Sequence, residues 1–243
     1  MTRVNKRFVS MEYDVFAEHL HTHWGCATDL WQAHEPTIKG IYRRYLALSC
    51  VAQILSDGSK RNAYVRALPE AGYLAMVLAL RSCQSACSVL LRQTIELSLR
   101  HIYFDTHPVE YSWVQKRDGY RDLDFVGVME YLKKTDEIEL LQGSAQILAT
   151  ICDWYARLSR YTHLHNGSYM GFPGINEAQT EVDLSLLRHA SESLWPQLIL
   201  LLCVFHADCF LKASAAEQKL VRDALGTPLK RALASYFREI SLS

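Results

Sequence analysis

Two arginines and two histidines lie close together in the segment DWYARLSRYTHLHNG, residues 153–167. Arg157 and Arg160 precede His163 and His165. A neutral imidazole can take the proton of a ribose 2′-hydroxyl, because histidine changes its charge near neutral pH. A guanidinium stays protonated and neutralises negative charge that develops on phosphoryl oxygens in the transition state. The cluster therefore contains the residue types that are needed to cleave an RNA phosphodiester without a metal ion.

The spacing within this cluster leaves several pairings open. At about 100° per residue, Arg160 and His163 share one face of a helix, whereas Arg160 and His165 lie about 140° apart. Asn166 and Gly167 follow directly and are suited to ending a helix, which would let the second pair approach. Alternatively, an arginine of one subunit meets a histidine of another. A non-catalytic interpretation is also open, because basic residues at a helix C-terminus complement the helix dipole.

Helical periodicity indicates the elements that position this cluster. Period-two alternation is scarce, and apolar residues recur at helical spacing between few breakers, with 6 prolines and 11 glycines in 243 residues. A helix is predicted from about Ser144 to His165, and it carries both arginines near its C-terminal end. Its core stripe is Ile147, Ile151, Trp154, Leu158 and Tyr161.

The remaining segments predict an all-α fold. The longest uninterrupted stretch with helical spacing of apolar residues runs from about Ala71 to Phe104. It contains Arg92 and Glu96, four residues apart. Further helices are predicted at about 10–32, from Pro36 onward, at 183–213 and at 216–240. We expect a helical bundle of about seven to nine helices in one domain, residues 1–243, with its core at about 70–213 and an N-terminal helical extension at 1–69.

Composition excludes several classes of site. Lysine plus arginine and aspartate plus glutamate are equal at 26 each, so no global field attracts nucleic acid. Glycine-rich phosphate loops and zinc-protease motifs are absent, the seven cysteines form no CxxC pair, and no cofactor or metal is predicted. His19 and His23 share a helical face but lack partner ligands. The remaining isolated histidines are interpreted as structural: His101, His107, His189 and His206.

Hydropathy and cysteine usage predict a cytoplasmic protein with no membrane partner. The longest apolar run, residues 194–205, is too short to span a bilayer. The N-terminal segment has no apolar stretch of the kind found in signal peptides. An odd number of cysteines inside apolar segments is typical of a reducing compartment.

Two segments in this order resemble the HEPN superfamily. These are LLRQTIELSLRHIYFDTHPVEY, residues 90–111, and WYARLSRYTH, residues 154–163. HEPN domains are all-helical, with an arginine and a histidine separated by four to six residues at the end of a late helix. RYTHLH, residues 160–165, fits this motif with four intervening residues, and RLSRYTH, residues 157–163, fits it with five. The resemblance covers about residues 70–210.

The resemblance implies a catalytic pair, either Arg160 with His165 or Arg157 with His163. It also implies a composite site across a two-fold homodimer and a 2′,3′-cyclic phosphate product, formed without a metal ion. Three further residues are implied to support the site: Arg92, Glu96 and Asn166.

The function expected from the cluster and the resemblance is that of a metal-independent endoribonuclease. Such a protein acts as a toxin or antiphage effector, with RNA as substrate and an antitoxin or other defence-system protein as a possible partner. The alternative is a non-catalytic HEPN-like helical module that binds a partner protein or a nucleic acid. A third possibility, a small-molecule sensor, rests only on the aromatic content of 11%.

Overall fold

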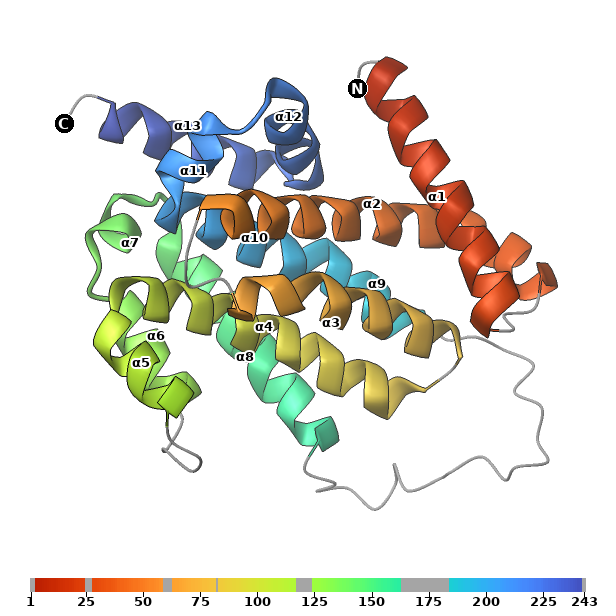
Figure 1. Ribbon diagram of the computed structural model, residues 1–243, viewed down its shortest axis with the longest axis horizontal. Helices are drawn as coiled ribbons and strands as arrows, with labels where there is room; N and C mark the ends of the chain where they lie inside the picture. The colour runs from red at the N-terminus through yellow and green to blue at the C-terminus, as the bar shows by residue number, and fades with distance from the viewer. Residues whose placement is uncertain are drawn as a thin grey trace.

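The computed structural model describes residues 3–24, 28–58, 63–81, 83–116, 124–162 and 184–241. In these ranges the chain forms helices and no strand (Figure 1), which confirms the predicted all-α fold class. The elements are α1 (Arg3–Trp24), α2 (Thr28–Gly58), α3 (Ala63–Leu80), α4 (Gln84–Thr106), α5 (Pro108–Lys116), α6 (Phe125–Leu132), α7 (Asp136–Leu140), α8 (Ser144–Thr162), α9 (Ser185–His189), the π-helical η2 (Ala190–Leu194), α10 (Trp195–Phe205), α11 (Ala207–Lys212), α12 (Ala215–Ala224) and α13 (Thr227–Ile240).

The chain turns more often than its hydrophobic periodicity predicts. The predicted helix at about 71–104 is two antiparallel helices, α3 and α4, which pack against each other. Two backbone hydrogen bonds close the end of α3, from Arg81 N to Val77 O at 3.1 Å and from Cys83 N to Leu78 O at 2.8 Å. The expectation of one continuous helix is wrong, because folding the chain back buries the apolar residues of both halves.

The N-terminal boundaries also differ from the prediction. α1 ends at Trp24, and α2 begins at Thr28 with Pro36 inside it, so Pro36 does not start a helix. A proline inside a helix removes one backbone hydrogen bond. Pro36 is exposed, and water can therefore reach this side of the helix. The predicted helix at about 183–213 likewise ends at Phe205, and α11 follows.

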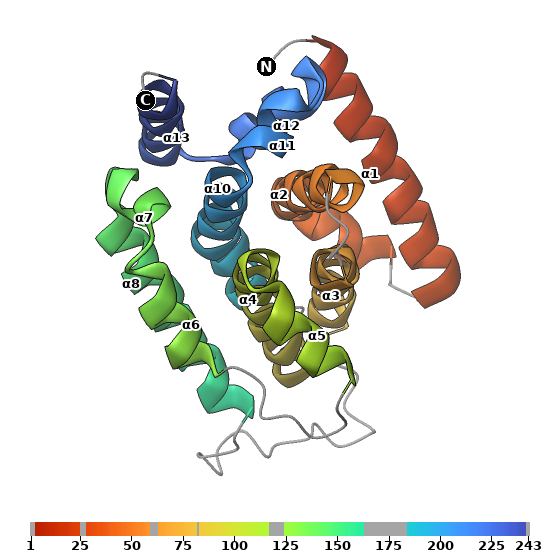
Figure 2. The same cartoon turned by 60° about the vertical axis from the view of Figure 1, so that its left-hand side comes forward.

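Helix α10 lies at the centre of the molecule. Figure 2 shows it between α2 on one side and α8 on the other, and it also contacts α4 and α13. The side chains of Trp195, Leu198, Ile199 and Leu200 in this helix are each 0% exposed. The surrounding core includes residues from Tyr13 in α1 to Tyr236 in α13. The position of α10 fixes the distance between α2 and the helix that carries the predicted site, α8.

Helix α3 is long and apolar enough to cross a membrane by length and composition alone, and it is the one such helix among the residues that the structure describes. It packs against α2 and α4. Its buried residues belong to the core of the bundle: Val65, Leu68, Ala71, Gly72, Ala75, Met76, Val77 and Ala79. These contacts are those of a core helix.

The histidine at the end of α10 predicts a pH-dependent stability. The His206 ring stacks on His101 with centroids 4.7 Å apart, and its Nδ1 lies 3.6 Å from Asp105 Oδ2. The side chain of His206 is 8% exposed. Burial lowers the pKa of His206 from its ordinary value of 6.5, and the Asp105 carboxylate opposes this effect. His206 therefore favours the folded state when it is neutral.

The direction in which stability changes with pH follows from the difference in proton binding between the folded and unfolded chain. Below pH 6.5 the unfolded chain binds a proton at His206 more readily than the folded chain does. We expect the free energy of unfolding, measured with urea, to fall as the pH is lowered from about 7.5 to about 5.5. His206→Gln is expected to reduce this fall. An unchanged pH dependence in the variant would show that His206 is not the group responsible for the fall in stability.

Candidate functional site

Helix α8 carries the predicted arginines and is anchored as the periodicity predicts. Four residues of the predicted core stripe are buried, with exposures of 3% for Ile147, 0% for Ile151, 7% for Trp154 and 0% for Leu158. The side chain of the fifth residue, Tyr161, lies outside the described part of the chain. This stripe packs α8 against α4, η2 and α10.

Both arginines of α8 are exposed, so they are available to a ligand. Arg157 and Arg160 lie three residues apart near the C-terminal end of the helix. No carboxylate within the described ranges forms an ion pair with either guanidinium. His163, His165 and Asn166 lie outside the described residues, which end at Thr162 on this helix. The two Arg/His pairings therefore stay predictions.

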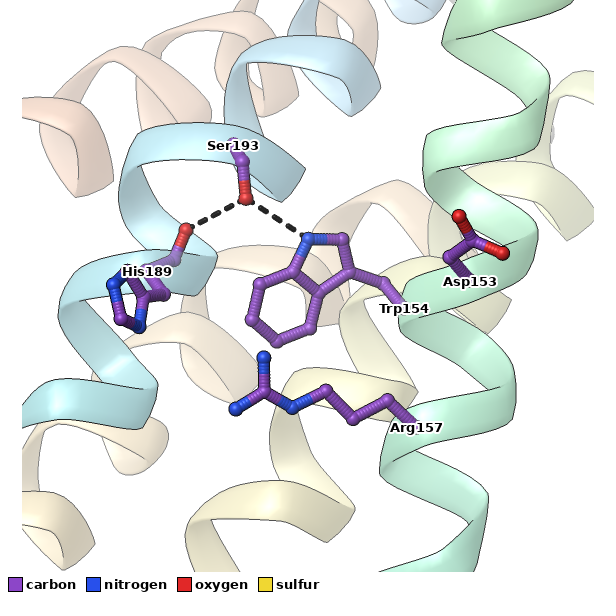
Figure 3. Close-up of a pocket in the computed structure, with 5 residues that line it drawn as sticks. All are labelled: Asp153, Trp154, Arg157, His189 and Ser193. Atoms are coloured by element: carbon purple, nitrogen blue, oxygen red, sulfur yellow. Dashed lines mark hydrogen bonds between the residues drawn. The ribbon is translucent and has the colours of Figure 1, made fainter.

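A pocket between α8 and the α9–η2 segment contains Arg157 (Figure 3). Its volume is about 340 Å³, and it is lined by Asp153, Trp154, Arg157, His189 and Ser193. The Arg157 Cζ lies 5.0 Å from the centroid of the Trp154 ring, which is cation–π distance. The guanidinium is therefore held against the indole face and is not paired with Asp153, one turn earlier.

Hydrogen bonds fix the opposite wall of this pocket. Trp154 Nε1 donates to Ser193 Oγ at 2.9 Å, and Ser193 Oγ donates to the carbonyl oxygen of His189 at 2.8 Å. Ser193 lies in η2, and His189 is the last residue of α9. Single π-helical turns are rare and occur frequently at functional sites. The chain of hydrogen bonds therefore links α8 to the irregular turn that presents His189.

Arg92 and Glu96 connect α4 to α8. Arg92 Nε lies 2.9 Å from Glu96 Oε1, which is the i,i+4 ion pair, and Arg92 Nη2 donates to Tyr155 Oη at 2.8 Å. The Tyr155 hydroxyl donates to Glu96 Oε1 at 3.3 Å, and Phe125 stacks on the Tyr155 ring with centroids 3.7 Å apart. We call Arg92, Glu96 and Tyr155 the α4–α8 triad. It lines a second cavity, of about 270 Å³, together with Phe125 and Arg100.

The triad and Arg157 lie on different sides of α8. Tyr155 faces α4, whereas Arg157 faces the pocket beside His189. Two residues along a helix correspond to about 200° of rotation. Arg92 and Glu96 thus hold the helix in place from one side, while Arg157 projects from another.

The local environment changes the acidity of Tyr155. Burial raises the pKa of its phenol, and the Glu96 carboxylate raises the pKa further, while the Arg92 guanidinium opposes both effects. The phenol therefore stays protonated at neutral pH and can donate its hydrogen to Glu96. This proton forms the hydrogen bond from the Tyr155 hydroxyl to Glu96 Oε1.

Removing the Tyr155 hydroxyl is expected to destabilise the α4–α8 contact moderately. Tyr155→Phe keeps the ring that stacks on Phe125 but removes the hydrogen bonds to Arg92 and Glu96. We expect a loss of about 1 kcal/mol in the free energy of unfolding, measured with urea. The matched control is Tyr111→Phe, because the Tyr111 hydroxyl has no hydrogen-bond partner among the described residues. Equal effects in both variants would contradict a stabilising triad.

The pocket residues His189, Ser193 and Asp153 were missed by sequence reasoning. The spacing of Trp154 and Arg157, three residues apart, indicates that these two side chains are neighbours. No comparable signal links either residue to His189, which belongs to another helix. Among the described side chains, no group of three or more His, Cys, Asp or Glu residues is arranged to hold a metal ion.

Comparisons with known proteins give no relative for this chain. No family model matches it, and neither a curated protein nor a solved structure matches it.

Proposed function

We propose that this protein is a metal-independent endoribonuclease of HEPN type that acts as a toxin or antiphage effector. The observation that carries the proposal is the pair of exposed arginines, Arg157 and Arg160, on the last turns of α8. His163 and His165 follow them directly in the sequence. Guanidinium groups without carboxylate partners in the described structure are suited to binding phosphoryl oxygens.

The proposed reaction uses only side-chain chemistry. An imidazole, from His163 or His165, takes the proton of the ribose 2′-hydroxyl, and the 2′-oxygen attacks the adjacent phosphorus. The bond from phosphorus to the 5′-oxygen breaks, and the leaving oxygen takes up a proton. The products are a 2′,3′-cyclic phosphate and a 5′-hydroxyl. Arg157 or Arg160 stabilises the charge on the non-bridging oxygens during this step.

The packing of α8 supports a rigid site of this kind. The helix is buried along the stripe that includes Trp154 and Leu158, and the α4–α8 triad holds it from the other side. Catalytic side chains need a fixed geometry, because small displacements lower the rate considerably. In this proposal the histidines come from the same motif or from the second subunit of a two-fold homodimer.

The purified chain tests the proposal directly. We expect it to cleave total bacterial RNA and a labelled single-stranded oligoribonucleotide in the presence of EDTA, with fragments that carry 2′,3′-cyclic phosphate and 5′-hydroxyl ends. The matching oligodeoxynucleotide is the control, because it lacks the 2′-hydroxyl and should stay intact. Intact RNA after prolonged incubation at high protein concentration would rule out the enzyme.

A second candidate function is a non-catalytic helical module that binds a partner protein. The observation that favours it is a pair of exposed apolar side chains on one face of α5. Val109 and Trp113, one turn apart on α5, are 55% and 49% exposed. Exposed apolar side chains that gather on one surface are typical of protein-binding sites. The cleavage assay separates the two candidates, since this module leaves RNA intact.

A further inference from the structure

The pocket beside α8 brings Arg157 together with a histidine that is remote in the sequence. Arg157 on α8 and His189 on α9 both line this pocket, and Figure 3 shows the imidazole of His189 to one side of the Arg157 guanidinium. Both side chains are exposed, and neither forms a hydrogen bond or ion pair with another described residue. An arginine and a histidine that line one pocket can offer several N–H donors to one anion.

Arg157 is held in a conformation that suits phosphate binding. Its guanidinium lies over the Trp154 ring, and Trp154 is itself 7% exposed and hydrogen-bonded to Ser193. No described residue accepts a hydrogen bond from the guanidinium, so its N–H groups are available to a ligand. Less side-chain entropy is lost on binding, because the tryptophan already restricts the arginine.

The backbone of His189 is held by a hydrogen bond from Ser193. Ser193 Oγ donates to its carbonyl oxygen, so the backbone at the start of the π-helical turn is fixed. The same hydroxyl accepts the hydrogen bond from Trp154, which joins the two walls of the pocket. The imidazole is thus presented from a rigid turn and not from a loop.

The charges in the pocket favour an anion on the side of His189. Asp153 is the one carboxylate that lines the pocket in the described structure. Figure 3 shows its carboxylate across the Trp154 indole from His189. An anion between Arg157 and His189 is therefore separated from Asp153 by the indole ring.

We propose that Arg157 and His189 together bind one phosphate of the RNA backbone, beside the bond that is cleaved. This assignment rests on the proposed function and adds to it a residue from outside the α8 motif, His189. The pocket binds a backbone phosphate and does not read bases, because Trp154 is buried beneath Arg157 and offers no face for stacking.

A non-cleavable RNA tests this site independently of catalysis. We expect a fluorescent 2′-O-methyl oligoribonucleotide to bind the wild-type chain in an anisotropy titration, since the modification blocks cleavage but keeps the phosphates. His189→Ala and Arg157→Ala are each expected to weaken binding by about tenfold. The slope of log Kd against log salt should decrease by about 0.7 in the double variant, which corresponds to the loss of one phosphate contact.

Two control variants remove a histidine and an arginine that lie outside the pocket. His34→Ala and Arg231→Ala remove a histidine on α2 and an exposed arginine on α13, and they should leave both affinity and salt slope unchanged. Binding that responds to His189 and Arg157, in a chain that cuts no RNA, would support the site and reject the nuclease. Cleaved RNA with wild-type affinity and salt slope in His189→Ala would overturn the phosphate site alone.

Discussion

Replacing both His163 and His165 with alanine is expected to lower the rate of RNA cleavage by at least about 100-fold. The proposed reaction needs an imidazole to take the proton of the 2′-hydroxyl, and the double substitution removes both imidazoles that directly follow Arg157 and Arg160. The rate is measured with labelled single-stranded RNA in EDTA. The single variants then distinguish the two motif pairings, because only the histidine that supplies the base shows the full loss.

Growth on expression provides a second measurement of the same prediction. A toxin or antiphage effector should arrest growth when the wild-type chain is expressed, and the double histidine variant should relieve the arrest. His34→Ala, on α2, is the control and should behave like the wild type. Growth arrest of equal strength with the double variant would show that these histidines are not responsible for toxicity.

The arginines of α8 are expected to show similarly large effects. Arg157→Ala or Arg160→Ala should lower the cleavage rate by about 100-fold to 1000-fold if that residue stabilises the transition state. Both side chains are exposed and form no ion pair with described residues, so Arg160→Ala should change the free energy of unfolding by about 0.5 kcal/mol or less. Arg157→Ala also loses the contact with the Trp154 ring and should cost about 1 kcal/mol or less. A rate that falls by this much while the chain stays folded identifies a chemical role. Arg231→Ala, on α13, should leave the rate unchanged.

Truncating Leu91 is expected to produce the largest loss of stability that we predict. Leu91 is 0% exposed in α4, the helix that packs against α3 and α8. Leu91→Ala removes apolar contacts and leaves a cavity, which costs about 2 to 5 kcal/mol. Domains are commonly stable by only about 5 to 15 kcal/mol, so this loss is a large fraction of the total. Urea unfolding at constant pH measures it.

The same helix offers a matched control for this prediction. Val89 lies two residues before Leu91 and is 47% exposed. Val89→Ala is expected to change the free energy of unfolding by about 0.5 kcal/mol or less, because few of its contacts are buried. Comparable losses in the two variants would mean that the α3–α4–α8 contact does not form the core described for this protein.

Local periodicity was sufficient to predict the helix that carries the candidate site. The spacing of Ile147, Ile151, Trp154 and Leu158 indicates one buried stripe, and all four side chains are buried. The exposure of Arg157 follows from the same pattern. These features are readable because an α-helix repeats every 3.6 residues, so that one stripe of side chains faces the core.

The packing of whole helices decided the rest of the site. Nothing in the spacing of the sequence indicates that His189 enters the pocket of Arg157, or that Tyr155 binds Arg92 across two helices. The spacing likewise did not indicate that the predicted helix at about 71–104 divides into α3, which ends at Leu80, and α4, which begins at Gln84. The sequence by itself therefore determined the all-α class and the faces of α8, whereas the tertiary structure decided which distant side chains meet. The physical reason is that periodicity is a property of neighbouring residues, whereas burial depends on every helix that covers a given face.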